Sequence, residues 1–127
     1  MTNEEVKGIV ENYVQAYNSF DVEGIVRHLH TDIVFRNYSK GQLDTETKGI
    51  EVFRELAEKS AKIFSSRRQT ILACLVMDDR AEVQIDYEGI LAIDLPNGLK
   101  AGDTLQLKGK SIFMMKEGKV SLIEDYS

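Results

Sequence analysis

Side chains that could act as nucleophiles or metal ligands are few in this sequence. The single cysteine, Cys74, lies in the apolar run ILACLVM, which is typical of a small core residue rather than of a reactive thiol. His28 and His30 are two positions apart and would not share a helix face, so a metal pair is not expected. The sequence has no CxxC, HExxH or GxSxG motif and no glycine-rich phosphate loop. We therefore expect no metal and no cofactor.

The composition predicts one folded domain that spans residues 1–127. Apolar residues make up 43% and charged residues 29% of the 127 positions, a balance that is ordinary for a globular protein. No apolar run approaches the ~18 residues that a membrane span needs, and the acidic start MTNEEVKG is unlike a signal peptide. A net charge of −5 would repel a phosphate backbone. These features predict a cytoplasmic protein that binds neither membranes nor nucleic acid.

A helical period of apolar residues runs through the first half of the chain. It predicts a helix over residues 4–18, followed by a short second helix that Asp21 can cap. We expect the second helix to bury Val22, Ile25, Val26 and Leu29 and to end at His28 and His30. A third helix is predicted over residues 49–64, with Ile50, Phe53, Ala57, Ala61 and Phe64 on its buried face.

Strand-like segments dominate the second half. An early strand is predicted over residues 33–38 and a polar loop over residues 39–47. Apolar runs and alternating side chains, separated by turn residues, predict four longer strands at residues 69–77, 81–94, 104–115 and 120–126. Together these elements indicate an α+β domain in which a curved antiparallel sheet is wrapped around three N-terminal helices.

Such a sheet leaves a space beside the helices where a ligand could bind. Seven residues are candidates for the walls of this pocket: Tyr13, Tyr17, Phe35, Phe53, Ile85, Tyr87 and Met114. An apolar cavity with a few polar groups suits a small apolar or amphipathic molecule. Each of these residues taken alone is more typical of a packed core.

Several segments also have the form of a known family. They are YVQAYNSFDVEGI at residues 13–25, Lys48-Gly49 before the third helix, IDYEG at residues 85–89 and EGKV before the last strand. In these segments the chain resembles the nuclear transport factor 2-like superfamily, and within it the SnoaL-like proteins and bacterial ketosteroid isomerase. The resemblance covers nearly the whole chain. It implies a cone-shaped fold with an internal pocket, and a homodimer formed through the outer sheet face.

The resemblance implies no single reaction, because members include isomerases, cyclases, dehydratases and epoxide hydrolases. The oxyanion-binding tyrosine of the isomerase falls on Tyr13, but its general-base aspartate falls on Asn37, which cannot accept a proton. Its second oxyanion donor falls on Lys110 when the last hairpin is aligned through residues 118–120. The resemblance therefore argues against steroid isomerisation by that mechanism.

The same alignment would turn Lys110 and Ile112 toward the pocket, beside Asp125 on the last strand. A cation and a carboxylate that meet in such a cavity would perturb each other's ionisation, although a structural ion pair or solvated charges are the simpler interpretation. Val120, Leu122 and Tyr126 form the more apolar side of that strand, which leaves open the face that lines the pocket.

Two main functional hypotheses follow. The first is an enzyme for proton transfer, isomerisation, cyclisation or hydration, with Asp125 as base and Tyr13, Asn37 and Lys110 as groups that orient the substrate. The second is a noncatalytic module that binds a small molecule or a partner surface, which Asn37 at the base position favours. A purely structural dimer with a filled core is a third possibility.

Overall fold

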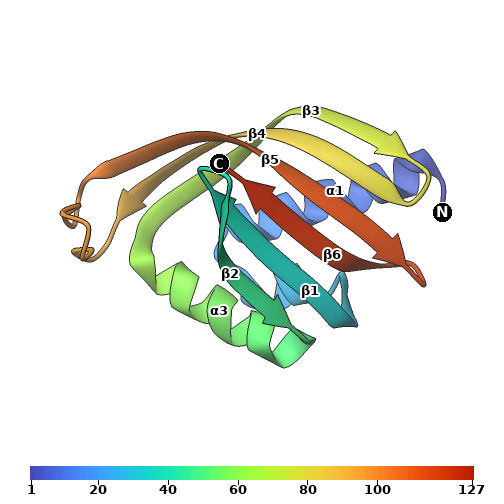
Figure 1. Cartoon of the computed structure of the whole chain (residues 1–127), viewed down its shortest axis with the longest axis horizontal. Coiled ribbons are helices and arrows are strands. Elements are labelled where there is room, and N and C mark those ends of the chain that lie inside the picture. Colours follow the sequence, from blue (N-terminus) through green and yellow to red (C-terminus); the bar gives the residue numbers. More distant parts are fainter.

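Three helices lie against one face of a curved six-stranded sheet in the computed structural model, which describes all 127 residues (Figure 1). In chain order the elements are α1 (Asn3–Asn18), α2 (Val22–Val26), β1 (Leu29–Ser39), β2 (Gln42–Lys48), α3 (Ile50–Ile63), β3 (Phe64–Met77), β4 (Arg80–Leu91), β5 (Thr104–Lys116) and β6 (Lys119–Tyr126). The predicted fold class is confirmed. The strand order is β2-β1-β6-β5-β4-β3, and the neighbouring pairs are antiparallel except for β1 and β6, which are parallel.

The predicted polar loop over residues 39–47 is wrong, because most of it forms strand β2. Lys40 and Gly41 have positive φ angles and make a tight turn, after which β2 pairs with β1. The β2 sequence QLDTETK is polar because this strand lies at an edge of the sheet and is largely exposed. Charged side chains on an edge strand also discourage pairing with other chains. The polar side chains of this segment were interpreted as a loop, but they reflect the exposed position of an edge strand.

The second helix is shorter than predicted. Asp21 caps it by accepting a hydrogen bond from the Gly24 amide at 3.0 Å, but the helix ends at Val26, and Leu29 and His30 belong to β1. Gly24 leaves room for the cap and for α1, since an added Cβ would lie 2.4 Å from the Asp21 carboxylate and 3.0 Å from the Ala16 side chain. Leu29 is nevertheless buried, with 2% of its surface exposed.

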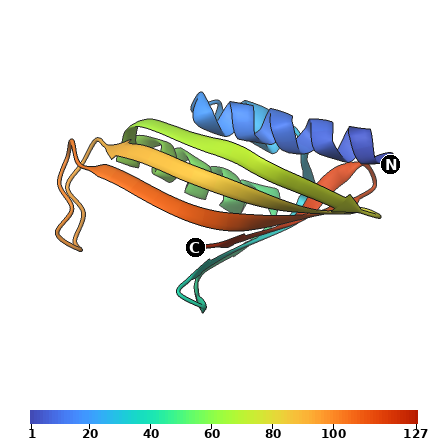
Figure 2. The ribbon, with the colours of Figure 1, turned by 90° about the horizontal axis from the view of Figure 1, so that it is seen from above.

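Helix α1 crosses the sheet on the side of β3 and β4 and supplies much of the core (Figure 2). Its start is fixed by a capping box between Thr2 and Glu5. The expected apolar stripe is buried against the sheet and includes Val6, Val10, Tyr13 and Val14. Helix α3 packs instead against β1 and β2. The two longer helices thus cover different parts of the same sheet face.

No helix of this fold is both long enough and apolar enough to cross a membrane.

Candidate functional site

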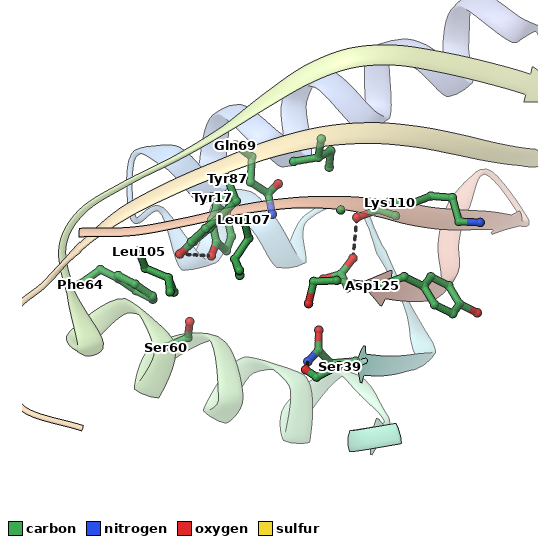
Figure 3. A pocket seen from close by; sticks show the side chains of 16 residues that line it. Tyr17, Ser39, Ser60, Phe64, Gln69, Tyr87, Leu105, Leu107, Lys110 and Asp125 are labelled. Atoms are coloured by element: carbon green, nitrogen blue, oxygen red, sulfur yellow. Dashed lines mark hydrogen bonds between the residues drawn. The ribbon is translucent and has the colours of Figure 1, made fainter. Parts of the chain in front are cut away.

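A cavity lies between helices α1 and α3 and the inner face of the sheet (Figure 3). Its inner lobe has a volume of about 230 Å³ and its outer lobe about 350 Å³. The two lobes share Tyr17, Asn37, Ser60, Gln69 and Asp125. Five further residues of the predicted walls line it: Tyr13, Phe35 and Phe53 in the inner lobe, and Ile85 and Tyr87 in the outer one. A space of this size argues against a completely filled core.

Asp125 on β6 is the carboxylate that faces this cavity. The Ser111 hydroxyl on the neighbouring strand β5 donates a hydrogen bond of 2.6 Å to its Oδ1 atom. Burial raises the pKa of Asp125 to about 6, even though the bond from Ser111 acts in the opposite direction. The Oδ2 atom makes no hydrogen bond within the protein. Asp125 is therefore a fixed carboxyl group that can exchange a proton near neutral pH.

Lys110 does not meet Asp125, so the predicted pairing of these two residues is wrong. Lys110 is in register with Tyr126, whereas Ser111 is opposite Asp125, and successive residues of a strand point to opposite faces. The lysine borders the outer lobe, but its Nζ atom lies on the outer face, 3.5 Å from Glu82 and 5.3 Å from the centre of the Tyr126 ring. The prediction came from aligning the last hairpin with the isomerase. An alignment that is wrong by one residue assigns every side chain of a strand to the opposite face of the sheet.

Ile112 and Met114 share the outer face with Lys110, and neither lines the cavity. Ile112 is 4% exposed there, while Met114 is 41% exposed. A bulge places Ser121 out of the pairing, with Met114 opposite Leu122 and Met115 opposite Val120. The bulge explains why the apolar residues of β6 are divided between the faces: Val120 and Ile123 join the core, while Leu122 and Tyr126 lie outside.

Asn37 occupies the position where the resemblance to the isomerase places a general-base aspartate. Its side-chain amide is hydrogen-bonded to Asp44. The Nδ2 atom donates to both carboxylate oxygens of Asp44, at 2.9 and 3.1 Å, and the Ser39 hydroxyl donates to Asp44 at 2.7 Å. These hydrogen bonds lower the pKa of Asp44 and favour its ionised form. With its NH₂ group engaged, Asn37 has its carbonyl oxygen left for a ligand.

Three tyrosine hydroxyls provide neutral polar groups along the cavity. Tyr13 is 6% exposed, packs edge-to-face on Phe113 at 5.4 Å and makes no hydrogen bond through its hydroxyl within the protein. Tyr17 donates a hydrogen bond of 3.1 Å to Tyr87. Burial raises the pKa of all three tyrosines, so they are hydrogen-bond donors at neutral pH rather than bases. Phe35 and Phe53 form an edge-to-face apolar wall beside them at 5.6 Å.

Arg67 on β3 is a cavity residue that sequence analysis did not identify. Its side chain is 5% exposed and lines the inner lobe. The predicted strand began at residue 69, and in the Arg67-Arg68 pair no feature of the sequence tells which arginine faces inward. Gln69 and Ser60 were missed for the same reason, since polar side chains on a strand or helix are normally expected at the surface.

The residues considered first for nucleophilic or metal chemistry lie outside this site. Burial raises the pKa of the Cys74 thiol, which favours its unreactive form. His30 lies near the carboxylates of Asp32 at 3.9 Å and Glu117 at 3.6 Å, both largely exposed. The structure contains no group of three or more histidine, cysteine, aspartate or glutamate side chains that could hold a metal ion.

Comparison with known proteins gives a consistent family assignment. Residues 10–123 match the model of a family described as the SnoaL-like domain. Among solved structures, a candidate polyketide cyclase from Xanthomonas campestris pv. campestris superposes with a TM-score of 0.85 at 16% identity, covering 98% of this chain and 90% of that one. No curated protein matches.

Two further structures show the same fold. AclR, a candidate hydroxylase from Streptomyces galilaeus, has a TM-score of 0.78 and 21% identity, covering 98% of this chain and 89% of its own. An LEH-like epoxide hydrolase from M. tuberculosis has a TM-score of 0.78 and 16% identity, with coverages of 97% and 82%. At such identities the likeness describes the fold, not the reaction.

Proposed function

Because the chain belongs to the SnoaL-like domain family, we propose that it is a small-molecule enzyme in which Asp125 moves a proton during a cyclisation or isomerisation. The observation that carries this proposal is a half-buried carboxyl group with a pKa of about 6 that faces a cavity with one oxygen unbonded. A general base is most effective when its pKa lies near the working pH. The Ser111 hydrogen bond holds this base in one orientation.

The proposed chemistry begins at a carbon next to a carbonyl group. Ionised Asp125 takes a proton from that carbon, the electrons of the C–H bond move onto the carbonyl oxygen, and an enolate forms. The neutral Tyr13 hydroxyl can donate a hydrogen bond to the developing negative oxygen. Protonated Asp125 then returns the proton, either to another carbon in an isomerisation or to the alkoxide that forms when the enolate carbon attacks a second carbonyl.

A substrate panel can test this proposal without knowledge of the natural substrate. The protein would be incubated in D₂O with small 1,3-dicarbonyl compounds, and exchange at the acidic carbon would be followed by NMR. We expect catalysed exchange in the wild type and a loss of ~10²- to 10⁴-fold in Asp125→Asn, the usual range for one acid–base group. Glu124→Gln is the matched control. Glu124 immediately precedes Asp125 on β6, but it pairs with Arg36 on the outer face. Equal exchange in wild type and Asp125→Asn, or none in either, would contradict the proposal.

A noncatalytic binding module is the second candidate function. It is favoured by Asn37, whose amide is held by Asp44 and cannot serve as a base. Such a module would bind a small molecule in the cavity with wild-type affinity in both Asp125→Asn and Glu124→Gln, and neither form would catalyse exchange.

We also propose that two copies of the chain associate through the outer sheet face. Leu72, Leu75 and Met77 on β3 and Met114 on β5 are all exposed on or beside this face. Between them lie charges of both signs, with Glu82 near Arg80 at 3.6 Å and near Lys110 at 3.5 Å. A patch that mixes apolar residues with both charges can complement a second copy of itself across a two-fold axis.

A further inference from the structure

Arg67 is a buried cation without a counter-ion. Only 5% of the surface of Arg67 is exposed. None of its side-chain nitrogen atoms lies within ion-pair distance of a carboxylate. Its guanidinium carbon lies 3.7 Å from the centre of the Tyr17 ring and 4.6 Å from that of Phe20, so aromatic faces provide part of its stabilisation. Buried charges in proteins are normally paired, because an isolated charge is costly to remove from water.

The hydrogen bonds of Arg67 leave one side of its planar group unused. Nε donates to the Tyr17 carbonyl oxygen at 2.9 Å, and Nη1 donates to the Ser60 hydroxyl at 3.3 Å. Nη2 is buried and has no partner. The side-chain Oε1 atom of Gln69, which lines the same inner lobe, is also buried without a partner. A buried polar group without a hydrogen-bond partner destabilises the fold, and two such groups occur in the wall of the inner lobe.

We propose that the inner lobe of the cavity binds the carboxylate group of an organic acid through Arg67. A carboxylate supplies both the missing negative charge and an acceptor for Nη2, and arginine binds carboxylates with well-defined geometry. A donor on the ligand, such as a hydroxyl group, would satisfy Gln69 Oε1. This inference rests on the proposed function and narrows its substrate class. The substrate would be an organic acid whose carboxylate binds Arg67 while its reactive carbon reaches Asp125.

A purely structural role for Arg67 is the competing explanation. Its bond to the Tyr17 carbonyl satisfies an acceptor in the last turn of α1, a turn that contains no basic residue of its own, and a cation there is favourable. That role requires Nε but leaves Nη2 unused. The two roles therefore differ in whether a small anion binds in preference to its neutral analogue.

Benzoate and benzamide provide this comparison, because they have nearly the same shape but differ in charge. Isothermal titration would measure both ligands with wild type, Arg67→Met and Arg68→Met. Arg68 is the control, since it is the adjacent arginine, exposed and paired in register with Glu88 on the outer face. We expect the wild type and Arg68→Met to prefer benzoate by about ten-fold or more, the effect of ~1.4 kcal/mol, and Arg67→Met to lose this preference.

A wild-type preference below about two-fold, or one that survives in Arg67→Met, would overturn the inference; so would the absence of benzoate binding. If Arg67→Met does not fold, the wild type still decides the matter, because benzoate but not benzamide should shift the NMR signal of the Arg67 Nε–H group. Asp125→Asn separates this inference from the proposed function: it should keep the benzoate preference while it loses proton exchange.

Discussion

The two faces of the sheet hold their charged groups in opposite ways. On the outer face the charges are paired, as in Arg36 with Glu46 at 2.7 Å and Glu124 at 3.1 Å, and Lys108 with Asp86 at 3.2 Å. On the inner face Arg67 and Asp125 line the cavity and neither has an ionic partner. Exposed pairs contribute little to stability, whereas isolated buried charges weaken it. The proposed roles of Asp125 in a reaction and of Arg67 in ligand binding would account for this difference.

The largest expected difference between the faces concerns packing on β5. Phe113 is 1% exposed in the core, while the next residue, Met114, is 41% exposed on the outer face. We expect Phe113→Ala to lower the free energy of unfolding by about 3–5 kcal/mol, because it leaves a core cavity. Met114→Ala should cost less than about 1 kcal/mol. Urea denaturation measures both, and equal losses would mean that the faces are assigned wrongly.

The next prediction concerns stability as a function of pH. The folded-state pKa of Asp125 is raised from 3.8 to about 6, so between these values the native state binds more protons than the unfolded state. Its contribution to stability is therefore greatest at low pH and falls as the pH rises from about 4 to about 7, by about 3 kcal/mol in total. Asp125→Asn should remove this fall and be more stable than wild type at pH 7.5.

Urea denaturation of wild type and variant between pH 4 and 7.5 measures the difference, in which contributions from the other carboxylates cancel. Glu124→Gln, on the paired outer face, should not reproduce the gain. A gain of equal size in Glu124→Gln would show that general charge reduction, not the burial of Asp125, is responsible.

A smaller effect is expected from the hydrogen bond that orients Asp125. Because the Ser111 hydroxyl stabilises the ionised carboxylate, Ser111→Ala should raise the pKa of Asp125, by about one unit if the bond contributes ~1.4 kcal/mol. The pH at which catalysed exchange is half-maximal should rise with it. Ser121→Ala is the control, since the Ser121 hydroxyl bonds the Met114 carbonyl oxygen instead. A profile that does not move would exclude Ser111 from this role.

The smallest change in folding stability is expected for a substitution on the outer sheet face, at the surface where we propose that two copies of the chain associate. Leu75 is 60% exposed, so Leu75→Glu should alter the unfolding free energy of a single copy by less than about 0.5 kcal/mol. In sedimentation experiments it should convert a dimer to the monomer of 14.4 kDa. Val52→Glu, at a 49% exposed site on α3, should leave the dimer intact. A monomeric wild type at micromolar concentration would remove the dimer proposal.

Periodicity was sufficient to predict the helices, most strands and the fold class, because apolar spacing reports directly on burial. It failed for β2, whose polar residues reflect an exposed edge, and for Leu29, which is buried from a strand rather than from a helix. Both errors arose where burial and local conformation are set by neighbours that are distant in the chain.

The site was harder to predict than the fold, because it depends on which face each strand residue occupies. Alternation identifies two faces but does not say which one lies inside, and the bulge at Ser121 changes the phase within β6. Asp125 was placed at the cavity by resemblance, and so was Lys110, which only borders the outer lobe and turns its Nζ atom to the outer face. Arg67 had no recognisable sequence feature, since its importance comes from the partner that it lacks.

The most direct test of the account is an NMR titration of the Asp125 side-chain carboxyl carbon in the wild-type protein. We predict a midpoint of about 6, because partial burial disfavours the ionised form of this carboxyl group and no cation pairs with it. A midpoint below about 4, the ordinary value for an aspartate, would mean that Asp125 is solvated or paired. It would contradict the claim that this residue is the proton-transferring group of the cavity.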